Sequence, residues 1–266
     1  GVAVVPPMDA NTQDVSILIG TEDISKLDMY PEDDPRVLSL NGAFNVGNRG
    51  IVEFVEIFKN EIEFLHTILT ATQEKRVPSP GKNAMIYFDG VIISHCNEAE
   101  WNRFKSEHTN EAILDRILKI EIPYVLELDE EIKIYEKMIS RSDFNDIHIA
   151  PHTIKIASMF SVMSRLKNSA KCDILTKMKI YNGEEVIEKG RVKKIDIKDL
   201  KEESEREGMS GISTRFIMKS LDSALSNSDN NMITPVSVID SLITNVKEQV
   251  ISEEKRSKYL ELLQKV

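Results

Sequence analysis

Glycine, lysine and hydroxyl residues at a fixed spacing could bind phosphate, but this sequence does not combine them. A phosphate-binding loop has the pattern GxxxxGK[ST], in which backbone N–H groups surround the phosphates, the lysine neutralises them and the hydroxyl holds Mg²⁺. No such string occurs among the 266 residues. The nearest run extends from Gly42 to Gly47 but continues with Asn48 and Arg49, and a predicted strand follows it where the loop requires a helix. We therefore reject it as a phosphate site.

Two other groups of residues resemble reactive sites without matching them. Residues 88–90, Phe-Asp-Gly, hold the residues of the kinase DFG motif in another order, and the HRD-like loop, glycine-rich loop and VAIK-like strand of eukaryotic kinases are missing. His148 and His152 have the spacing of zinc ligands on a helix, but Pro151 between them disfavours a helix through both. The sequence thus excludes a eukaryotic-type kinase site and favours no zinc site.

The composition is that of a folded protein with an acidic surface. A hydrophobic content of 41% can fill a sizeable core, and no apolar stretch approaches the roughly 20 residues that span a bilayer. The net charge of −10 repels nucleic acid and anionic lipid. The two cysteines, Cys96 and Cys172, have no paired spacing, and no secretory leader is visible, which suits a reducing cytosol. We expect a cytoplasmic protein without nucleic-acid or membrane partners.

Strands and helices alternate in the first half, as is typical of a parallel α/β sheet. The β-branched and aromatic run at residues 51–57 predicts a buried strand, and apolar residues at helical spacing follow up to residue 73. The opening, residues 1–34, is predicted to be loop-rich. The remaining predicted elements are a protruding hairpin within residues 74–89, strands at 90–94 and 118–122, and a short helix at 110–116.

The second half is predicted to be helical. Apolar residues recur at helical spacing in five segments: residues 128–140, 151–166, 211–225, 235–250 and 252–266. Acidic residues open the first of these segments and a proline opens the second, as at many helix N-termini. The charge-dense stretch at residues 184–208 lacks an apolar stripe and is predicted to be an exposed insertion.

Several stretches, taken in order, resemble one known family. They are LNGAFNVGNRGIVEFVEI (residues 40–57), LTATQEKRV (69–77), DGVIISHCNEAEW (89–101), NEAILDRI (110–117), EEIKIYEKMI (130–139) and GMSGISTRF (208–216). Together they resemble the PrkA family of bacterial AAA+ proteins, known as serine protein kinases, over nearly the whole chain. More distantly, the same order resembles the AAA+ domain of bacterial enhancer-binding activators.

The resemblance implies a fold and a division into domains. Residues 1–126 would form the C-terminal part of an AAA+ α/β core, with the Walker B strand, a hairpin before sensor 1, sensor 1 and an arginine finger. Residues 127–266 would form an all-helical lid domain that carries sensor 2. The expected fold class is therefore α/β, a partial AAA+ parallel-sheet core followed by a helical lid.

The resemblance also assigns two carboxylates. Glu56 stands where AAA+ proteins have the glutamate that activates water for attack on the γ-phosphate. Val55 stands where they have the aspartate that directs Mg²⁺, which leaves Glu53, two residues earlier on the same face of the strand, as the substitute metal ligand beside Glu56. The alternative is that Glu53 and Glu56 are solvated charges at the end of a strand.

Three further side chains receive roles in the same way. Asn97 matches sensor 1, Arg116 matches an arginine finger that reaches a neighbouring subunit, and Arg215 matches sensor 2 at the start of a lid helix. The simpler alternatives are a turn residue for Asn97, a local ion pair with Asp115 or Glu111 for Arg116, and a helix-surface arginine for Arg215.

ATP and Mg²⁺ are the cofactors that the resemblance implies. The family's phosphate-binding loop would lie before Gly1, so the 266 residues are expected to be inactive on their own and to need that region for both ligands. The expected partners are a protein substrate and, through Arg116, other copies of the chain.

Three functions remain open at this point. The first is an ATP-hydrolysing regulator that phosphorylates serine in a protein substrate, as the family name implies. The second is a machine that couples ATP hydrolysis to remodelling or proteolysis, and the third is an interaction domain without catalytic activity.

Overall fold

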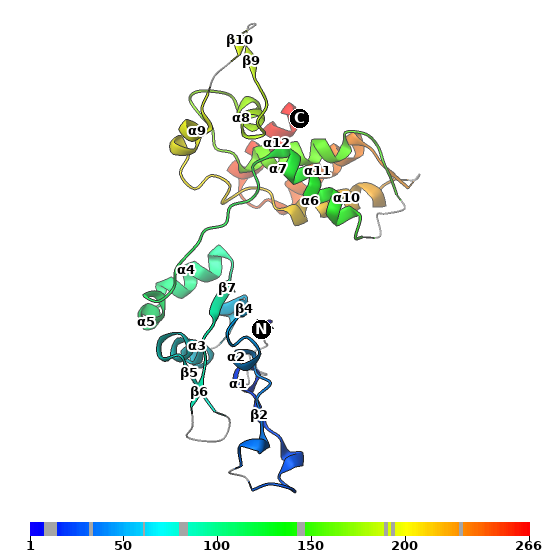
Figure 1. The fold of residues 1–266 in the computed structure, drawn as a ribbon. Helices are drawn as coiled ribbons and strands as arrows, with labels where there is room; N and C mark the ends of the chain where they lie inside the picture. The colour runs from blue at the N-terminus through cyan, green and yellow to red at the C-terminus, as the bar shows by residue number, and fades with distance from the viewer. Residues whose placement is uncertain are drawn as a thin grey trace. The chain divides into compact units, whose positions relative to one another are not determined.

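The computed structural model divides the chain into two compact units, Gly1–Lys119 and Ile120–Val266, and each is described by itself (Figure 1). The structure describes residues 1–7, 15–31, 34–60, 62–79, 85–142, 147–188, 191–192, 195–228 and 231–266. Among these residues, no helix has both the length and the apolar character needed to cross a membrane. The domain boundary predicted after residue 126 stays a prediction.

A three-stranded parallel sheet forms the centre of the N-terminal unit. Its order is β1 (Val2–Val5), β4 (Ile51–Val55) and β7 (Val91–His95). Ile51 lies opposite Val2 on one side and opposite Val91 on the other, so the three strands start level with one another. The predicted α/β class with a parallel sheet is confirmed.

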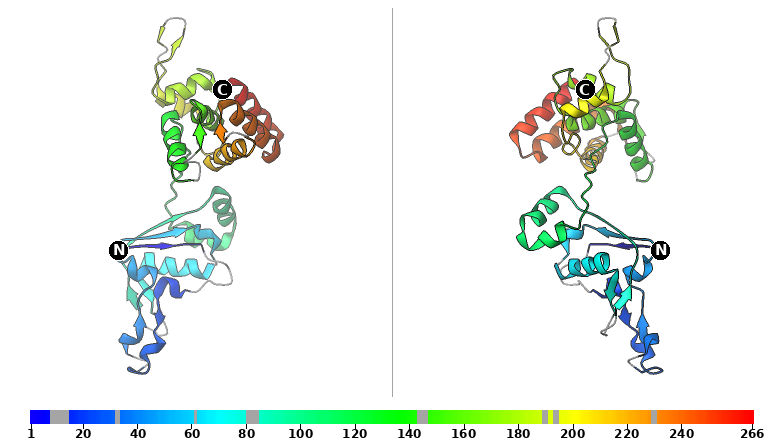
Figure 2. Two further views of the ribbon diagram at one scale, coloured as in Figure 1. Left: turned by 90° about the vertical axis from the view of Figure 1, so that its right-hand side faces the viewer. Right: turned by 60° about the vertical axis from the view of Figure 1, so that its left-hand side comes forward.

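Helices pack on one face of this sheet, and the other face is exposed. Val52 and Phe54 point into a core that they share with Phe64 and Leu65 of α3 (Ile62–Glu74). In Figure 2 this helix is cyan and lies beside the sheet. Because strand side chains alternate between faces, the residues between them point the other way. Among these, the exposed apolar residues are Val2, Val4, Ile51, Val91 and Ile93. Parallel sheets normally bury both faces, so this face is an apolar surface that the described residues leave uncovered.

Shorter elements complete the N-terminal unit. They are α1 (Ser16–Ile19), β2 (Thr21–Glu22) paired with β3 (Leu38–Ser39), the 3-10 turns η2 (Ile24–Lys26), η3 (Pro35–Val37), η4 (Ile57–Lys59) and η5 (His108–Asn110), α2 (Ala43–Val46), α4 (Glu98–Ser106) and α5 (Glu111–Leu114). Strands β5 (Arg76–Pro78) and β6 (Met85–Tyr87) pair antiparallel and confirm the predicted hairpin, although residues 80–84 between them lie outside the described part.

Two predictions for the first 122 residues are wrong. The opening contains the strand β1, whose four residues are too short a run to stand out beside the prolines that follow. Residues 118–122 form no strand, and Leu118, Ile120 and Ile122 are 86%, 71% and 78% exposed. The apolar alternation there is real, but the segment pairs with no described strand, and a strand needs a partner for its backbone groups.

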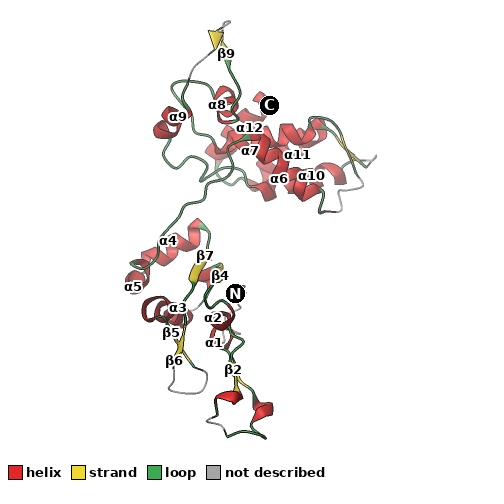
Figure 3. Ribbon diagram, in the orientation of Figure 1, coloured by secondary structure: helices red, strands yellow, loops and turns green. Residues whose placement is uncertain are grey.

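The C-terminal unit is built almost entirely from helices (Figure 3). They are α6 (Leu128–Ile139), α7 (Thr153–Arg165), α8 (Ile174–Tyr181), α9 (Ile197–Glu203), α10 (Thr214–Ser226), α11 (Pro235–Gln249) and α12 (Glu253–Lys265). Two short strand pairs join them, β8 (His148–Ile149) with β11 (Met232–Ile233) and β9 (Ile187–Glu188) with β10 (Arg191–Val192). The helical region is confirmed, with these two small additions. Helix α7 contributes Phe160, Val162 and Met163 to the centre of the core.

The charge-dense stretch at residues 184–208 is not wholly an exposed insertion, as its composition had predicted. Leu200 of α9 is fully buried, and Glu207 forms a buried ion pair with Lys177 of α8 at 2.6 Å. The Tyr181 hydroxyl donates a hydrogen bond to the Glu207 carboxylate at 2.6 Å. Burial is the largest cause that raises the pKa of Tyr181, and the Glu207 carboxylate raises it further. Charged residues at the end of the stretch are therefore satisfied inside the fold, while residues 189–190 and 193–194 lie outside the described part.

A second buried ion pair joins α6 to α7. The guanidinium of Arg165 donates to both oxygens of Glu131, at 2.7 and 2.8 Å, and the two side chains are 0% and 1% exposed. Arg165 also donates to the carbonyls of Val125 and Ile212, and the Tyr135 hydroxyl donates to Glu131. One arginine thus connects two helices with the segments before α6 and before α10.

Removing one charge of this pair should open the C-terminal unit. Glu131→Gln leaves the Arg165 guanidinium buried without its counter-charge, and we expect a loss of about 3 kcal/mol in the free energy of unfolding. Hydrogen exchange followed by mass spectrometry would report it as faster exchange of the α6 and α7 peptides. Glu130→Gln is the matched control, since Glu130 is exposed and pairs with Lys133 at 2.6 Å. Equal exchange in the two variants would contradict the assigned role of the pair.

Candidate functional site

The carboxyl ends of β4 and β7 bring two of the predicted site residues to the same edge of the sheet. The strands are parallel and Val55 lies opposite His95, so Glu56 comes one residue, and Asn97 two residues, after the last paired residue of its strand. In open α/β sheets, ligands bind in the crevice outside this edge.

Glu56 occupies an unusual backbone conformation at the end of β4. Its φ of 51° places it in the left-handed region, which is uncommon for a residue other than glycine and which turns the chain from β4 into η4. Its carboxylate accepts a hydrogen bond from Lys59 Nζ at 2.7 Å. The hydrogen bond to Glu56 is the main cause that raises the pKa of Lys59, and the negative charge of Glu56 adds to it. Glu56 is therefore held by a lysine one turn further along the chain.

Asn97 caps the helix α4 that follows β7. Its side-chain oxygen accepts from the Glu100 backbone N–H at 2.8 Å, and the Glu100 carboxylate accepts from the Asn97 backbone N–H at 3.5 Å. This reciprocal arrangement is a capping box, which satisfies two N–H groups that a helix start leaves open. The simpler alternative for Asn97, a local structural role, thus has a basis in the structure. The cap uses only the amide oxygen, so the NH₂ group can still donate.

Lys59 and Glu100 connect the two strand ends. Lys59 Nζ lies 3.9 Å from Glu100 Oε1, close enough for an ion pair but beyond hydrogen-bond distance. A continuous line of contacts therefore runs from Glu56 through Lys59 and Glu100 to Asn97. Neither connecting residue was predicted from the sequence, because each is a charged residue on a short surface element and nothing local shows that the two meet.

Aromatic side chains hold η4 against α4. Phe58, next to Lys59, stacks on Phe104 with ring centroids 4.2 Å apart and contacts Trp101 at 5.8 Å. Trp101 and Phe104 are three residues apart and so share a face of α4. Such aromatic pairs stabilise a fixed contact, which positions the backbones of Lys59 and Glu100 next to each other. The spacing of Trp101 and Phe104 is the sequence signal that could have predicted this contact.

Glu53, the predicted substitute metal ligand, has a different partner from Glu56. Its carboxylate lies 3.3 Å from His95 Nε2 on the exposed face of the sheet. Within the described residues, no three His, Cys, Asp or Glu side chains come together as a metal site. The metal role of Glu53 and Glu56 stays a prediction.

Arg116 lies just after α5 in the N-terminal unit and is exposed. Its guanidinium donates to the carbonyl of Ala112, one turn back. Glu111 and Asp115 are both in the described part and form no ion pair with it, so the simpler alternative of a local ion pair does not hold in this structure.

Arg215 lies in the C-terminal unit, in the first turn of α10, and is exposed. Ser213 caps this helix by accepting from the Phe216 N–H at 3.3 Å. The turn before it passes Arg165 so closely that Gly211, with φ of 136°, has no room for a side chain, because a Cβ would lie 2.9 Å from the Arg165 Cα. The segment before α10 is therefore packed closely against the end of α7.

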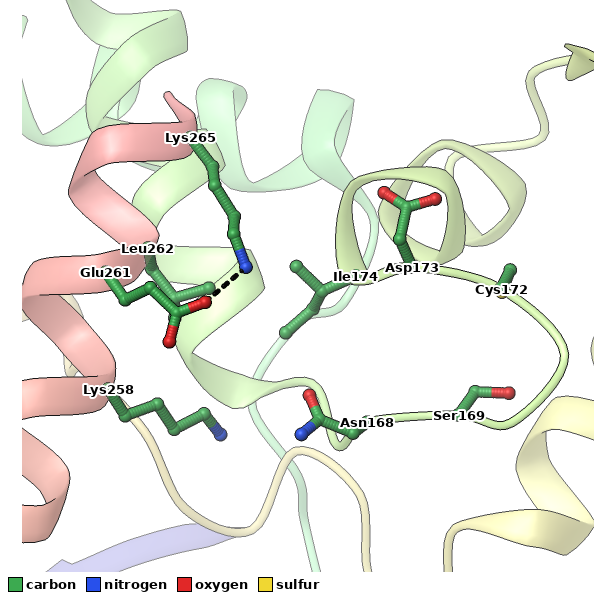
Figure 4. Close-up of a pocket in the computed structure, with 9 residues that line it drawn as sticks. All are labelled: Asn168, Ser169, Cys172, Asp173, Ile174, Lys258, Glu261, Leu262 and Lys265. Atoms are coloured by element: carbon green, nitrogen blue, oxygen red, sulfur yellow. Dashed lines mark hydrogen bonds and ion pairs between the residues drawn. The ribbon is translucent and has the colours of Figure 1, made fainter.

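The C-terminal unit also contains a cavity of about 260 Å³ that none of the predicted site residues lines (Figure 4). It lies between the loop before α8 and the helix α12. The ammonium of Lys258 points into it, and burial lowers the pKa of this lysine. Lys265 and Glu261 on its rim pair with each other at 2.7 Å, and Asp173 caps α8. Because its charges of opposite sign balance, the cavity indicates no particular ligand.

Two family models together match nearly the whole chain. The model of the PrkA AAA domain matches residues 1–173, and that of the PrkA serine protein kinase C-terminal domain matches residues 175–266. The chain is 39% identical over 267 residues to a Bacillus subtilis (strain 168) protein named ATP-dependent protease PrkA, with 99% of this chain and 42% of the relative covered. It is 38% identical over 270 residues to Serine/threonine kinase YeaG of Escherichia coli (strain K12), with 98% and 41% covered.

Solved structures show a weaker similarity. The ATP complex of NtrX from Brucella abortus matches with a TM-score of 0.42 and 13% identity, covering 100% of this chain and 56% of that one. Another NtrX structure from the same organism matches with a TM-score of 0.45 and 12% identity, covering 99% and 57%. At these scores the similarity supports no conclusion about this chain.

The relatives are similar along nearly all of this chain, although the chain spans only about two fifths of their length, 42% and 41%. The chain belongs to the PrkA family.

Proposed function

We propose that these residues form the water-activating and nucleotide-sensing part of an ATP-hydrolysing AAA+ protein that acts on other proteins. The observation that carries the proposal is the line of contacts from Glu56 through Lys59 and Glu100 to Asn97, at the carboxyl edge of a parallel sheet. Family membership supports it, since a family model that matches residues 1–173 is an AAA domain.

Each of the two terminal residues of this line has chemistry suited to hydrolysis. The Glu56 carboxylate, once released from Lys59, accepts a proton from a water molecule and so activates it as a nucleophile. The Asn97 amide keeps its oxygen on the α4 cap and has its NH₂ group to donate to a phosphate oxygen or to the attacking water. In this proposal the helix cap orients the sensor.

ATP with Mg²⁺ supplies the phosphoryl group and the positive charge that neutralises it. Glu56, and Glu53 in place of the aspartate absent at Val55, are the carboxylates we assign to the metal. For Glu53 this requires release from His95, which lies 3.3 Å away. Arg215 at the start of α10 is the residue we assign to sensing the nucleotide from the lid.

The phosphate grip is proposed to come from residues outside these 266. The sequence holds no GxxxxGK[ST] string, and the chain covers 42% of one relative and 41% of another. The residues described here would then have the reacting and sensing groups without the cradle of backbone N–H groups.

The output on a protein substrate has two candidates. Phosphorylation of serine is favoured by the name of the Escherichia coli relative, a serine/threonine kinase, and by the name of the second family model. Proteolysis driven by ATP is favoured by the name of the Bacillus subtilis relative. Phosphate transferred from ATP to a serine, and lost with Glu56→Gln, would decide for the first. An inactive interaction domain is the remaining alternative.

Calorimetry should separate the phosphate grip from the rest of the site. We expect the 266 residues alone to show no saturable binding of Mg·ATP at ~1 mM, because the phosphate cradle is missing. The same protein extended N-terminally through a GxxxxGK[ST] loop should bind with a Kd in the micromolar range. Tight binding by the 266 residues alone would contradict the proposal.

Substitutions at the two strand ends should separate catalysis from folding. In the extended protein, Glu56→Gln should lower kcat for ATP hydrolysis by about 100-fold or more, since it removes the base. Asn97→Ala should lower kcat by at least about tenfold. Asn97→Ser is the matched control, because serine caps a helix well but cannot reach as far. Activity retained by Asn97→Ser and lost by Asn97→Ala would mean that Asn97 acts only as a cap.

Mixing two inactive variants tests whether Arg116 acts on a neighbouring subunit. An arginine finger is worth a factor of about 10³ or more in kcat, so Arg116→Ala in the extended protein should be inactive. Mixed with Glu56→Gln, it should regain part of the wild-type turnover, because some interfaces then combine an intact Arg116 with an intact Glu56. Arg103→Ala, another exposed arginine of this unit, should keep its activity. No recovery on mixing, with assembly intact, would contradict a role in trans.

A further inference from the structure

Lys59 lies between two carboxylates, and its ammonium is nearer to one than to the other. Its Nζ is 2.7 Å from Glu56 and 3.9 Å from Glu100. A displacement of the ammonium by little more than the difference between these distances would exchange one partner for the other. Lysine suits such an exchange, since its charge sits on a flexible four-carbon chain that can turn while the backbone stays in place.

Glu100 has the geometry of a second partner for the Lys59 ammonium. Its Oε2 is engaged with the Asn97 backbone N–H, while Oε1 is the oxygen nearest to Lys59. The Glu100 side chain is 18% exposed and that of Glu56 is 38% exposed. A pair with Glu100 would therefore be less screened by solvent than the pair with Glu56. Both carboxylates contribute to raising the pKa of Lys59, with Glu56 the larger cause.

The surrounding backbone makes exchange, rather than separation, the available motion. The contact of Phe58 with Phe104 and Trp101 fixes η4 on α4, so Lys59 stays near Glu100 even when it leaves Glu56. Glu56 itself lies in the left-handed region of φ, where a residue with a side chain is strained. The lysine thus pairs with a carboxylate on a strained backbone and has a less exposed alternative close by.

We propose that Lys59 is a positioning residue that holds Glu56 in the resting state and moves to Glu100 to release it, which couples the base after β4 to the sensor at the start of α4. This rests on the proposed function, in which Glu56 is the base. While a Glu56 carboxylate oxygen accepts the hydrogen bond from the Lys59 ammonium, that oxygen is not free to accept a proton from water. When the Lys59 ammonium moves to Glu100, Glu56 is free to act as the base. The positive charge then lies beside Glu100, which forms the capping box with Asn97.

Opposite effects of two substitutions in the full-length protein would test the exchange. Lys59→Met removes the restraint and should raise basal kcat by about two- to fivefold, with KM unchanged, whereas Lys59→Arg should stay near wild type. Glu100→Gln removes the alternative partner and should lower kcat by a similar factor, about two- to fivefold, while glutamine preserves the capping box. In the double variant kcat should equal that of Lys59→Met, because Glu100 acts through Lys59.

The matched control is Lys26→Met. Lys26 also follows an acidic N-cap residue by three positions on a 3-10 turn, pairs with Asp23 at 3.2 Å, and lies in the same unit. It should leave kcat unchanged. A fall in kcat with Lys59→Met, or an equal effect of Glu100→Gln with and without Lys59, would overturn the exchange. If Glu56→Gln keeps full turnover, the proposed function fails instead.

Labelling of Lys59 gives a readout that is independent of turnover. Acetic anhydride with quantitative mass spectrometry measures the reactivity of individual lysine amines, which pairing with a carboxylate suppresses. In the nucleotide-free protein, Glu56→Gln should raise labelling of Lys59 by about two- to threefold and Glu100→Gln should change it little. With a non-hydrolysable ATP analogue bound, the order should reverse. Labelling that depends on Glu56 in both states would overturn the exchange even if Glu56 proves to be the base.

Discussion

The fold of the C-terminal unit depends on satisfying the buried ion pair between Glu131 and Arg165. A buried charge is tolerated only when its partner and its remaining hydrogen bonds are all in place. Arg165 meets this condition by bonding to Glu131 and to the carbonyls of Val125 and Ile212. These groups come from separate segments of the chain, so none of the segments can shift without leaving a charge unsatisfied. The pair therefore specifies the arrangement of helices more than it adds to stability.

The same requirement explains how the segment before α10 is tied to the rest of its unit. Glu207 near its start is bound to Lys177, and Ile212 near its end is bound to Arg165. Gly211 lets the backbone pass against Arg165 where a side chain would collide. The first turn of α10, with Arg215, is thus fixed to the core of its own unit. In the N-terminal unit, the stacking of Phe58 on Phe104 has the corresponding effect for the elements that follow β4 and β7.

The sequence predicted those features that local pattern determines. The β-branched run before Glu56 and the short apolar run before Asn97 indicated strands, and helical spacing indicated most helices of the second half. Glu56 and Asn97 were assigned by resemblance, and the structure brings both to one sheet edge. Lys59 and Glu100 could not be predicted, since their contact depends on how η4 meets α4 and not on either local sequence.

The errors have physical causes of the same kind. Alternation of Leu118, Ile120 and Ile122 has the period of a strand, but pairing depends on a partner that the pattern does not contain. Residues 184–208 have the composition of a solvated loop, yet Glu207 is buried and forms an ion pair with Lys177 that satisfies both charges. In both cases the outcome depends on whether another part of the chain supplies a partner, which a local pattern cannot show.

The uncovered face of the three-stranded sheet affects how the chain behaves in solution. Val2, Val4, Ile51, Val91 and Ile93 present branched aliphatic side chains to water on one face of the sheet. Two such faces gain free energy by covering each other, because contact removes apolar area from water. The net charge of −10 opposes this approach by mutual repulsion. Salt screens the repulsion and leaves the attraction intact, so the colloidal stability of the isolated chain falls as ionic strength rises.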